Sequence, residues 1–184
     1  MRVISGKARG TKLNTIEEKS TRPTLDRVKE SLFNIIQSKV ADSNVLDLFA
    51  GSGALGIESL SRNANIAYFC EKNHEAVKAI RQNLERTNLL NKAVIVNSDY
   101  QECLKKLKEQ FDLIFIDPPY KDDIAVKAVD IIINKNILRK DGIIIIETDE
   151  IERELLEIKS IENVRVIDQR KYGRAHLIFL KEEN

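Results

Sequence analysis

The sequence predicts an α/β fold with a seven-stranded, mostly parallel sheet and helices packed on both of its faces. Strand-like and helix-like segments alternate from Asn44 onward, which is the pattern of repeated βα units. The segments 113–116 and 143–146 are apolar at every position, so both faces of these strands must be covered. The last two strand-like segments have no helix between them, and we expect them to form an antiparallel hairpin at one edge of the sheet.

Seven apolar segments have the length of strands, and the segments between them carry apolar residues at helical spacing. The expected strands are 45–49, 66–71, 93–97, 111–116, 142–147, 163–168 and 176–181. The expected helices are 54–62, 74–88, 100–109, 124–134 and 150–157. Together these elements predict a Rossmann-like core over residues 44–184.

Two smaller elements precede this core. Residues 1–20 are expected to form a basic arm or a small β-hairpin, because their two glycines favour turns. Residues 21–40 predict a leading helix, which begins at Leu25 with Thr24 as its N-cap. Since no repeat, low-complexity tract or linker divides the chain, we expect residues 1–184 to form one domain.

The charge of the chain is unevenly distributed. The whole sequence of 184 residues is 42% hydrophobic and has a net charge of +1. Its first 22 residues carry six basic side chains and two acidic ones, a net charge of +4, which leaves −3 for the rest. A basic arm on a mildly acidic body favours a polyanionic partner such as nucleic acid, although a solvated surface hairpin would have the same composition.

Nothing in the sequence points to a metal site, a disulfide framework or a membrane segment. Cys70 and Cys103 lack the spacing of metal ligands, and the polar first ten residues lack the apolar segment of a signal peptide. The longest apolar stretch, 143–146, is far too short to span a bilayer. We therefore expect a cytoplasmic protein that binds no metal.

A glycine-rich stretch links the first strand of the core to its first helix. Residues 47–56 read Asp-Leu-Phe-Ala-Gly-Ser-Gly-Ala-Leu-Gly and contain the pattern G-x-G-x-x-G. Glycines let the backbone approach a ligand closely, and free N–H groups at the start of the helix face that ligand. Glu71 ends the next apolar segment twenty residues after Gly51, where a ribose-binding acid is expected. The pattern fits NAD, S-adenosylmethionine or a turn that binds no cofactor.

A second motif, Asp117-Pro118-Pro119-Tyr120, directly follows the apolar segment 111–116, at the end of a strand where such sheets bind ligands. The Asp117 carboxylate and the Pro118 carbonyl can accept hydrogen bonds from the exocyclic amino group of a nucleobase, while the Tyr120 ring stacks beneath the base. An amino nitrogen held in line with a sulfonium methyl group is poised for methyl transfer. The motif alone could be a structural turn, but beside the glycine motif it favours an amino-methyltransferase over an NAD-dependent oxidoreductase.

The two motifs together resemble those of the class I S-adenosylmethionine-dependent amino-methyltransferases. More narrowly, residues 1–6, the pairs Arg9-Gly10 and Lys12-Leu13, and residues 21–35 are similar to the RsmD family, and the similarity covers essentially the whole chain. It implies methylation of N2 of a guanine in small-subunit ribosomal RNA. S-adenosylmethionine would be the methyl donor, S-adenosylhomocysteine the product, and no metal would take part.

The resemblance also implies roles for individual residues. The catalytic residues would be Asp117, Pro118, Pro119 and Tyr120. The cofactor-binding residues would be Asp47, Phe49, Gly51, Gly53, Glu71, Asp99, Tyr100 and Thr24. Apart from the resemblance, the positive charge of the arm predicts Arg2, Lys7, Arg9, Lys12 and Arg22 as RNA-binding residues. Asp99 could also cap a helix, and Arg22 and Thr24 could contact either cofactor or RNA. Ala175 stands where the family pattern has a small hydroxylated residue, which weakens any role for the hairpin 172–176.

The expected partner is ribosomal RNA, the small ribosomal subunit or an assembly intermediate of it, and we expect a monomer. Two other functions fit parts of the sequence. The Asp-Pro-Pro-Tyr motif also serves DNA adenine-N6 methyltransferases, but little chain remains here for a domain that reads a duplex. A non-catalytic RNA-binding module of the same fold is opposed by the intact Asp117, Tyr120 and glycine motif.

Overall fold

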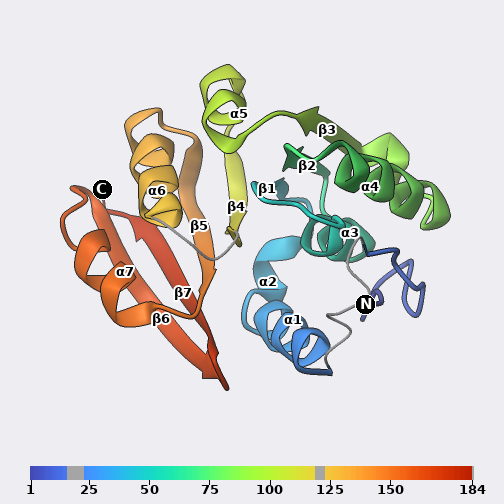
Figure 1. Ribbon diagram of the computed structural model, residues 1–184, viewed down its shortest axis with the longest axis horizontal. Helices are drawn as coiled ribbons and strands as arrows, with labels where there is room; N and C mark the ends of the chain where they lie inside the picture. Colours follow the sequence, from blue (N-terminus) through green and yellow to red (C-terminus); the bar gives the residue numbers. More distant parts are fainter. Residues whose placement is uncertain (16–22, 119–122, 184) are drawn as a thin grey trace.

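Seven strands form one sheet in the computed structural model, which describes residues 1–15, 23–118 and 123–183. The strands are β1 (Asn44–Asp47), β2 (Ile66–Glu71), β3 (Ala93–Asn97), β4 (Phe111–Ile116), β5 (Leu138–Thr148), β6 (Val164–Tyr172) and β7 (Ala175–Glu182). Their order across the sheet is β3-β2-β1-β4-β5-β7-β6 (Figure 1). Strands β1 to β5 are parallel to one another, and β7 is antiparallel to both β5 and β6. The expected parallel sheet with an antiparallel edge hairpin is confirmed.

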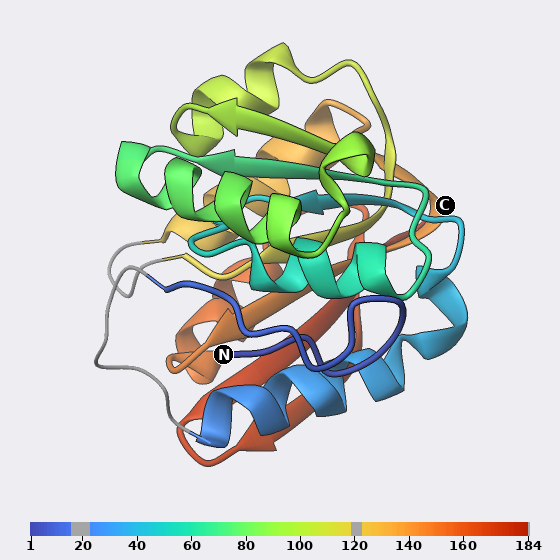
Figure 2. The same ribbon diagram turned by 90° about the vertical axis from the view of Figure 1, so that its right-hand side faces the viewer.

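Helices cover both faces of this sheet (Figures 1 and 2). They are α1 (Pro23–Ile35), α2 (Gln37–Val40), α3 (Ala54–Ser61), α4 (His74–Arg86), α5 (Tyr100–Lys106), α6 (Ile124–Asn134) and α7 (Ile151–Ile158), with a 3₁₀ turn at Leu90–Lys92. The N-terminal arm and α1 to α4 share one core cluster with Phe69 and Phe115, whereas α5 to α7 pack on the other face with Phe111. Within the described ranges, no helix is long and apolar enough to cross a membrane.

The start of the leading helix differs from the prediction. Helix α1 begins at Pro23, so Thr24 lies inside the helix and is not its N-cap. Proline suits the first turn of a helix, because its fixed φ is helical and the N–H that it lacks would have no partner there. The N-cap prediction for Thr24 is therefore wrong.

The C-terminal hairpin is longer than predicted. The pairing of β6 with β7 continues to Tyr172 and Ala175, which leaves only Gly173 and Arg174 as the turn. The polar residues 169–171 belong to an edge strand that pairs through its backbone. An apolar pattern could not reveal this extension, since the pairing depends on main-chain hydrogen bonds and not on burial of side chains.

The arm was expected over residues 1–20, of which 16–20 lie outside the described residues. Residues 1–15 fold back on themselves through an antiparallel bridge between Arg2 and Lys12. The arm buries Val3, Ala8 and Leu13 in the core cluster that also contains α3. In Figure 2 it lies between α1 and α3. The arm is thus an integral layer of the molecule and not a solvated appendage.

A buried carboxylate fixes this arm to two helices. Glu58 of α3 is fully buried and accepts hydrogen bonds from the backbone N–H groups of Ile4 (2.8 Å) and Ser5 (3.0 Å). It also pairs with Nζ of Lys29 on α1 at 3.3 Å and with Nε of Arg62 at 2.8 Å. A buried charge is tolerated only when it is paired and hydrogen-bonded, and Glu58 meets this requirement with four donors.

A buried amide joins the arm to the glycine-rich turn. The side-chain oxygen of Asn83 on α4 accepts from the backbone N–H of Asn14 at 2.7 Å. Its side-chain nitrogen donates to the carbonyl of Asn14 at 3.0 Å and to the carbonyl of Ser52 at 2.9 Å. Ser52 belongs to the glycine-rich turn, so this one side chain fixes the end of the arm beside that turn.

Gly6 provides a direct test of how the arm is seated. A methyl group at Gly6 would lie 1.9 Å from the carbonyl oxygen of Ser61, whereas one at Gly10 would meet nothing within 4 Å. Both glycines have a positive φ, 84° at Gly6 and 86° at Gly10, which costs alanine about 1–2 kcal/mol at either position. Gly6→Ala should therefore lower the free energy of unfolding in urea by about 2 kcal/mol more than Gly10→Ala does. Equal losses in the two variants would contradict this seating of the arm.

Candidate active site

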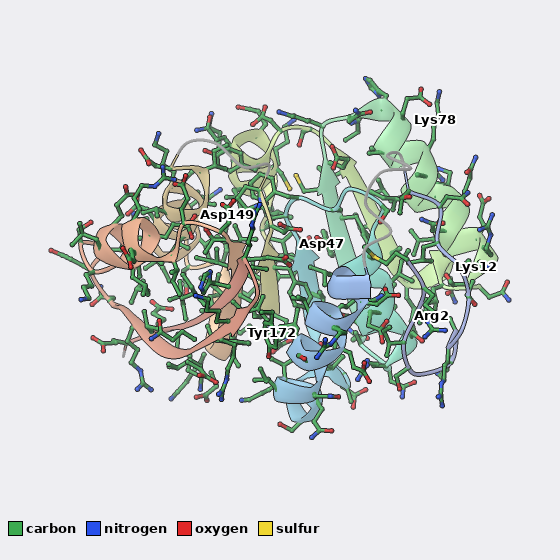
Figure 3. The ribbon with its side chains drawn as sticks, turned by 60° about the horizontal axis from the view of Figure 1, so that its bottom comes forward. Arg2, Lys12, Asp47, Lys78, Asp149 and Tyr172 are labelled. Atoms are coloured by element: carbon green, nitrogen blue, oxygen red, sulfur yellow. The ribbon has the colours of Figure 1, made fainter. Side chains whose placement is uncertain are left out.

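Four acidic residues lie at the ends of neighbouring parallel strands. Asp47 ends β1, Glu71 ends β2, Asp117 follows β4 directly, and Glu147 is the penultimate residue of β5. The chain passes from β1 outward to β2 and β3 and then crosses to β4 on the other side of β1. Ligands of open α/β sheets bind where the strand order reverses in this way. Figure 3 shows Asp47 near the centre of the molecule, between the arm and the β6–β7 hairpin.

The glycine motif forms a turn between β1 and α3, as predicted. Gly51 and Gly53 have φ values of 52° and 78°, a region that favours glycine. A methyl group on Gly51 would meet nothing within 4 Å, so the backbone of the turn is open on that side. Gly56 has a different role, because a methyl group there would lie 2.3 Å from the ring of Phe69. It lets α3 pack closely on β2.

Asp47 is a buried carboxyl that faces the start of α3. It is 2% exposed, and its Oδ2 accepts from the backbone N–H of Gly56 at 3.0 Å. Burial raises the pKa of Asp47 to about 7, the hydrogen bond from Gly56 opposes this rise, and the charge of Glu71 adds to it. The hydrogen bond to Asp47 therefore fixes the start of α3 beside the end of β1. A cation bound nearby would stabilise the ionised form of the Asp47 carboxyl.

Glu71 is held by two backbone donors. Its Oε2 accepts from the N–H of Gly51 at 2.9 Å, and its Oε1 accepts from the N–H of Asn73 at 2.8 Å. A carboxylate oxygen has two lone pairs, so each oxygen keeps capacity for a further donor such as a ribose hydroxyl. These contacts orient Glu71 beside the open turn.

Asp99 and Tyr100 lie beyond the end of β3. The Oδ1 atom of Asp99 accepts from the backbone N–H groups of Gln101 and Glu102, so Asp99 is the N-cap of α5. Its Oδ2 takes no part in the cap. The Tyr100 ring contacts the Phe49 ring with centroids 5.4 Å apart. The capping role of Asp99 is confirmed, and its expected role at an adenine stays a prediction.

Asp117 and Glu147 stand side by side on adjacent strands. Ile116 of β4 pairs with Ile146 of β5, and the next residue on each strand is the acid. Desolvation raises the pKa of Asp117 well above its ordinary value, and the charges of Glu147 and Asp47 raise it further. Its side chain keeps an exposed surface, so this desolvation is partial. Burial also raises the pKa of Glu147.

Several predicted site residues lie outside the described part of the chain. Pro119 and Tyr120 fall in 119–122 and Arg22 falls in 16–22, so their roles stay predictions. Pro118 is described and half-buried directly after Asp117. In the described ranges, no three His, Cys, Asp or Glu side chains gather closely enough to hold a metal ion.

The family model described as "Conserved hypothetical protein 95" matches residues 1–181. The chain belongs to this family, and its expected relationship to RsmD proteins is confirmed. It is 36% identical over 153 residues to "Ribosomal RNA small subunit methyltransferase D" of Haemophilus influenzae, which covers 82% of this chain and 79% of that one. It is 35% identical over 185 residues to "Putative rRNA methyltransferase YlbH" of Bacillus subtilis, with 99% of both chains covered.

A solved structure supports the same family fold. The structure titled "Putative methyltransferase yhhF from Escherichia coli" superposes with a TM-score of 0.87 at 29% identity. The superposition covers 100% of this chain and 98% of that chain. The Rossmann-like class I methyltransferase fold expected from the sequence is therefore confirmed over the full length of the chain.

The predicted RNA-binding residues of this RsmD-family chain lie on its surface. Arg2, Lys7, Arg9 and Lys12 are all exposed, and none of them pairs with an acid among the described residues. A pocket of about 680 Å³ lies between the arm and α1. Four arginines help to line it: Arg2, Arg9, Arg27 and Arg62. Arg62 is paired with Glu58, and Asp26 and Glu30 also line the pocket, whereas the unpaired basic side chains of the arm are available to phosphate groups.

Three residues that support the site were missed by the sequence analysis. Glu58 and Asn83 were missed because their partners are backbone groups far away in the chain, which no local pattern indicates. Glu147 carried a signal that could have been used, since it follows the apolar segment 143–146 as Asp117 follows 111–116. An acid at the end of a buried parallel strand lies at the ligand-binding edge of the sheet.

Proposed function

We propose that this protein transfers a methyl group from S-adenosylmethionine to N2 of a guanine in small-subunit ribosomal RNA. One observation carries the proposal: Asp117 follows β4, on the strand adjacent to β1 and its glycine turn. The Asp117 carboxylate, which can hold an amino group, thus lies one strand away from the glycine turn, a turn of the kind that binds nucleotide cofactors. The names of the relatives supply the substrate class, since they are ribosomal RNA methyltransferases and not DNA methyltransferases.

The residues around the glycine turn fit S-adenosylmethionine. Glu71 would accept from the ribose hydroxyls, because it is a fixed carboxylate with free lone pairs. Asp47 would face the cationic methionine part, which would favour its ionised form. Asp99 would accept from the adenine amino group through Oδ2, beside the paired rings of Phe49 and Tyr100. When bound, the cofactor supplies an electrophilic methyl group on a sulfonium.

The residues after β4 fit the amino group of the target base. The Asp117 carboxylate and the Pro118 carbonyl would accept the two N–H groups of guanine N2, and Tyr120 would stack on the base. As the new N–C bond forms, the nitrogen becomes cationic and must lose one proton. Asp117 is suited to accept that proton, because desolvation and two neighbouring acids raise its pKa.

The arm would bind the RNA around the target. A guanine that is paired or stacked must be exposed before its N2 can react, which costs a few kcal/mol. Contacts between phosphates and the exposed Arg2, Lys7, Arg9 and Lys12 can offset that cost. Asn83 fixes the end of the arm beside the glycine turn, so RNA bound by the arm would lie near the cofactor.

We further propose that the chain acts as one domain and as a monomer. The arm shares its core cluster with α1, α3 and the sheet, which supports one folding unit over residues 1–184. Ribosomal RNA and small ribosomal subunits are in the cytoplasm, so the proposed activity places the protein there.

The proposed chemistry can be tested by separating cofactor binding from methyl transfer. Asp117→Ala should lose about 100-fold or more in turnover on small-subunit ribosomal RNA, because the amino group loses its acceptor. Its affinity for S-adenosylhomocysteine, measured by calorimetry, should change less than about twofold. Glu71→Ala should instead weaken that affinity by about 1–3 kcal/mol through loss of a charged acceptor. Tight binding of NADH without binding of S-adenosylhomocysteine would contradict the proposal.

The arm can be tested through the salt dependence of RNA binding. Replacing Arg9 and Lys12 by alanine should weaken RNA binding and flatten its log–log salt dependence by about one to two units, because two phosphate contacts are lost. Binding of S-adenosylhomocysteine should be unaffected. Lys140→Ala with Lys159→Ala is the matched control, since both lysines are exposed and neither belongs to the arm. A wild-type affinity and salt slope in the arm variant would remove the arm from the RNA interface.

A further inference from the structure

Glu147 occupies the same level of the sheet as Asp117. The parallel register pairs Phe115 with Ile145 and Ile116 with Ile146, so Asp117 and Glu147 are the next pair along β4 and β5. Figure 1 shows these two strands side by side. Paired positions of neighbouring strands direct their side chains to the same face of a sheet. Asp47 of β1 pairs with Phe115, so the cofactor-side acid lies on that face as well.

The acids at these strand ends fall into two groups. Asp47 accepts from a backbone N–H through Oδ2, and each carboxylate oxygen of Glu71 accepts from one backbone N–H. Asp117 and Glu147 accept no hydrogen bond and form no ion pair with any residue in the described part of the chain. Two adjacent carboxylates without donors repel each other. Because ionised carboxylates only accept hydrogen bonds, a ligand with two donors side by side would suit this pair.

Guanine presents this pattern on its Watson–Crick edge. Its N2 amino group and its N1–H are adjacent donors, whereas adenine places an acceptor, the N1 lone pair, beside its amino group. A flipped-out base is read through this edge. If Asp117 holds the N2 amino group, the N1–H would lie beside Glu147, the neighbouring acid on β5.

We propose that Glu147 accepts a hydrogen bond from N1–H of the target guanine and thereby makes the site specific for guanine. The inference rests on the proposed function, because it requires that the N2 amino group is the methyl acceptor. The N1 proton stays on the base throughout, and Glu147 remains a carboxylate. A base with a lone pair at N1 would face the charge of Glu147 without a bridging proton, and the carboxylate would be left unpaired.

Two-aminopurine in place of the target guanosine tests this role. It keeps the N2 amino group but has a lone pair at N1 and lacks O6, so the variant described next assigns the preference to Glu147. The substrate is a small-subunit ribosomal RNA fragment that carries either base at the mapped target position, and kcat/KM is measured for both. A site built to bond a substrate N–H rejects an analogue without it by about 100-fold or more. Wild-type protein should show this preference for guanosine, and comparable methylation of the two RNAs would overturn the proposal.

The variant Glu147→Gln gives the second measurement. Its amide can donate to the N1 lone pair, so the preference for guanosine should fall by about tenfold or more. The affinity for S-adenosylhomocysteine should not change, since Glu147 lies on β5, two strands away from β1 and its glycine turn. Glu152→Gln is the matched control, because Glu152 is exposed on α7. An unchanged preference in Glu147→Gln that still binds S-adenosylhomocysteine would overturn the proposal.

The outcomes also separate this inference from the proposed function. If wild-type protein does not methylate the guanosine RNA, the proposed function fails. If it methylates guanosine and 2-aminopurine alike, only the role of Glu147 fails. Should Glu147→Gln not fold, Glu147→Ala is used, and it should lower kcat/KM on guanosine while losing the same preference. Equal methylation of the two RNAs by wild-type protein overturns the proposal even if neither variant folds, whereas a preference for guanosine supports Glu147 when a variant at this position reduces it.

Discussion

The buried carboxylate of Glu58 is the interaction on which the seating of the basic arm depends. The fully buried carboxylate joins two backbone N–H groups of the arm, Lys29 of α1 and Arg62 in one cluster. Desolvation lowers the pKa of Lys29, and the charge of Glu58 opposes that change, so each ion makes the burial of the other tolerable. Removal of the Glu58 carboxylate would leave Lys29 buried without its ion-pair partner, a kind of loss that typically costs about 3–5 kcal/mol. Glu58 lies on α3, the helix that starts at the glycine turn, so the same helix holds both the arm and the turn in place.

The layout of the candidate site follows from the order of the strands. Strands β2 and β1 carry Glu71 and Asp47 on one side of the reversal point, whereas β4 and β5 carry Asp117 and Glu147 on the other. Cofactor and target base would therefore lie over different pairs of strands, with the transfer taking place between them. The same two pairs of acids also differ in their hydrogen bonds. Asp47 and Glu71 accept from backbone N–H groups, whereas Asp117 and Glu147 have no donor among the described residues.

The sequence indicated the features that depend on local patterns. Unbroken apolar segments predicted the buried parallel strands, and the glycine spacing predicted the turn after β1. The start of α1 was wrong by two residues, because Pro23 is tolerated at the first helical position and Thr24 looked like a cap. Asn83 and Glu58 could not be predicted, since their partners lie 69 and 54 residues away in the chain. The extension of β6 to Tyr172 depends on backbone pairing and leaves no apolar pattern.

The central claim is that this chain methylates N2 of a guanine in small-subunit ribosomal RNA, and nucleoside mass mapping tests it most directly. Ribosomal RNA is compared from cells with the protein, without it, and with only the Asp117→Ala variant. One N2-methylguanosine in the small-subunit RNA should be present in the first and absent from the second. It should be strongly reduced in the third. An identical set of methylated guanosines in all three, or loss of a methylated adenine instead, would contradict the account.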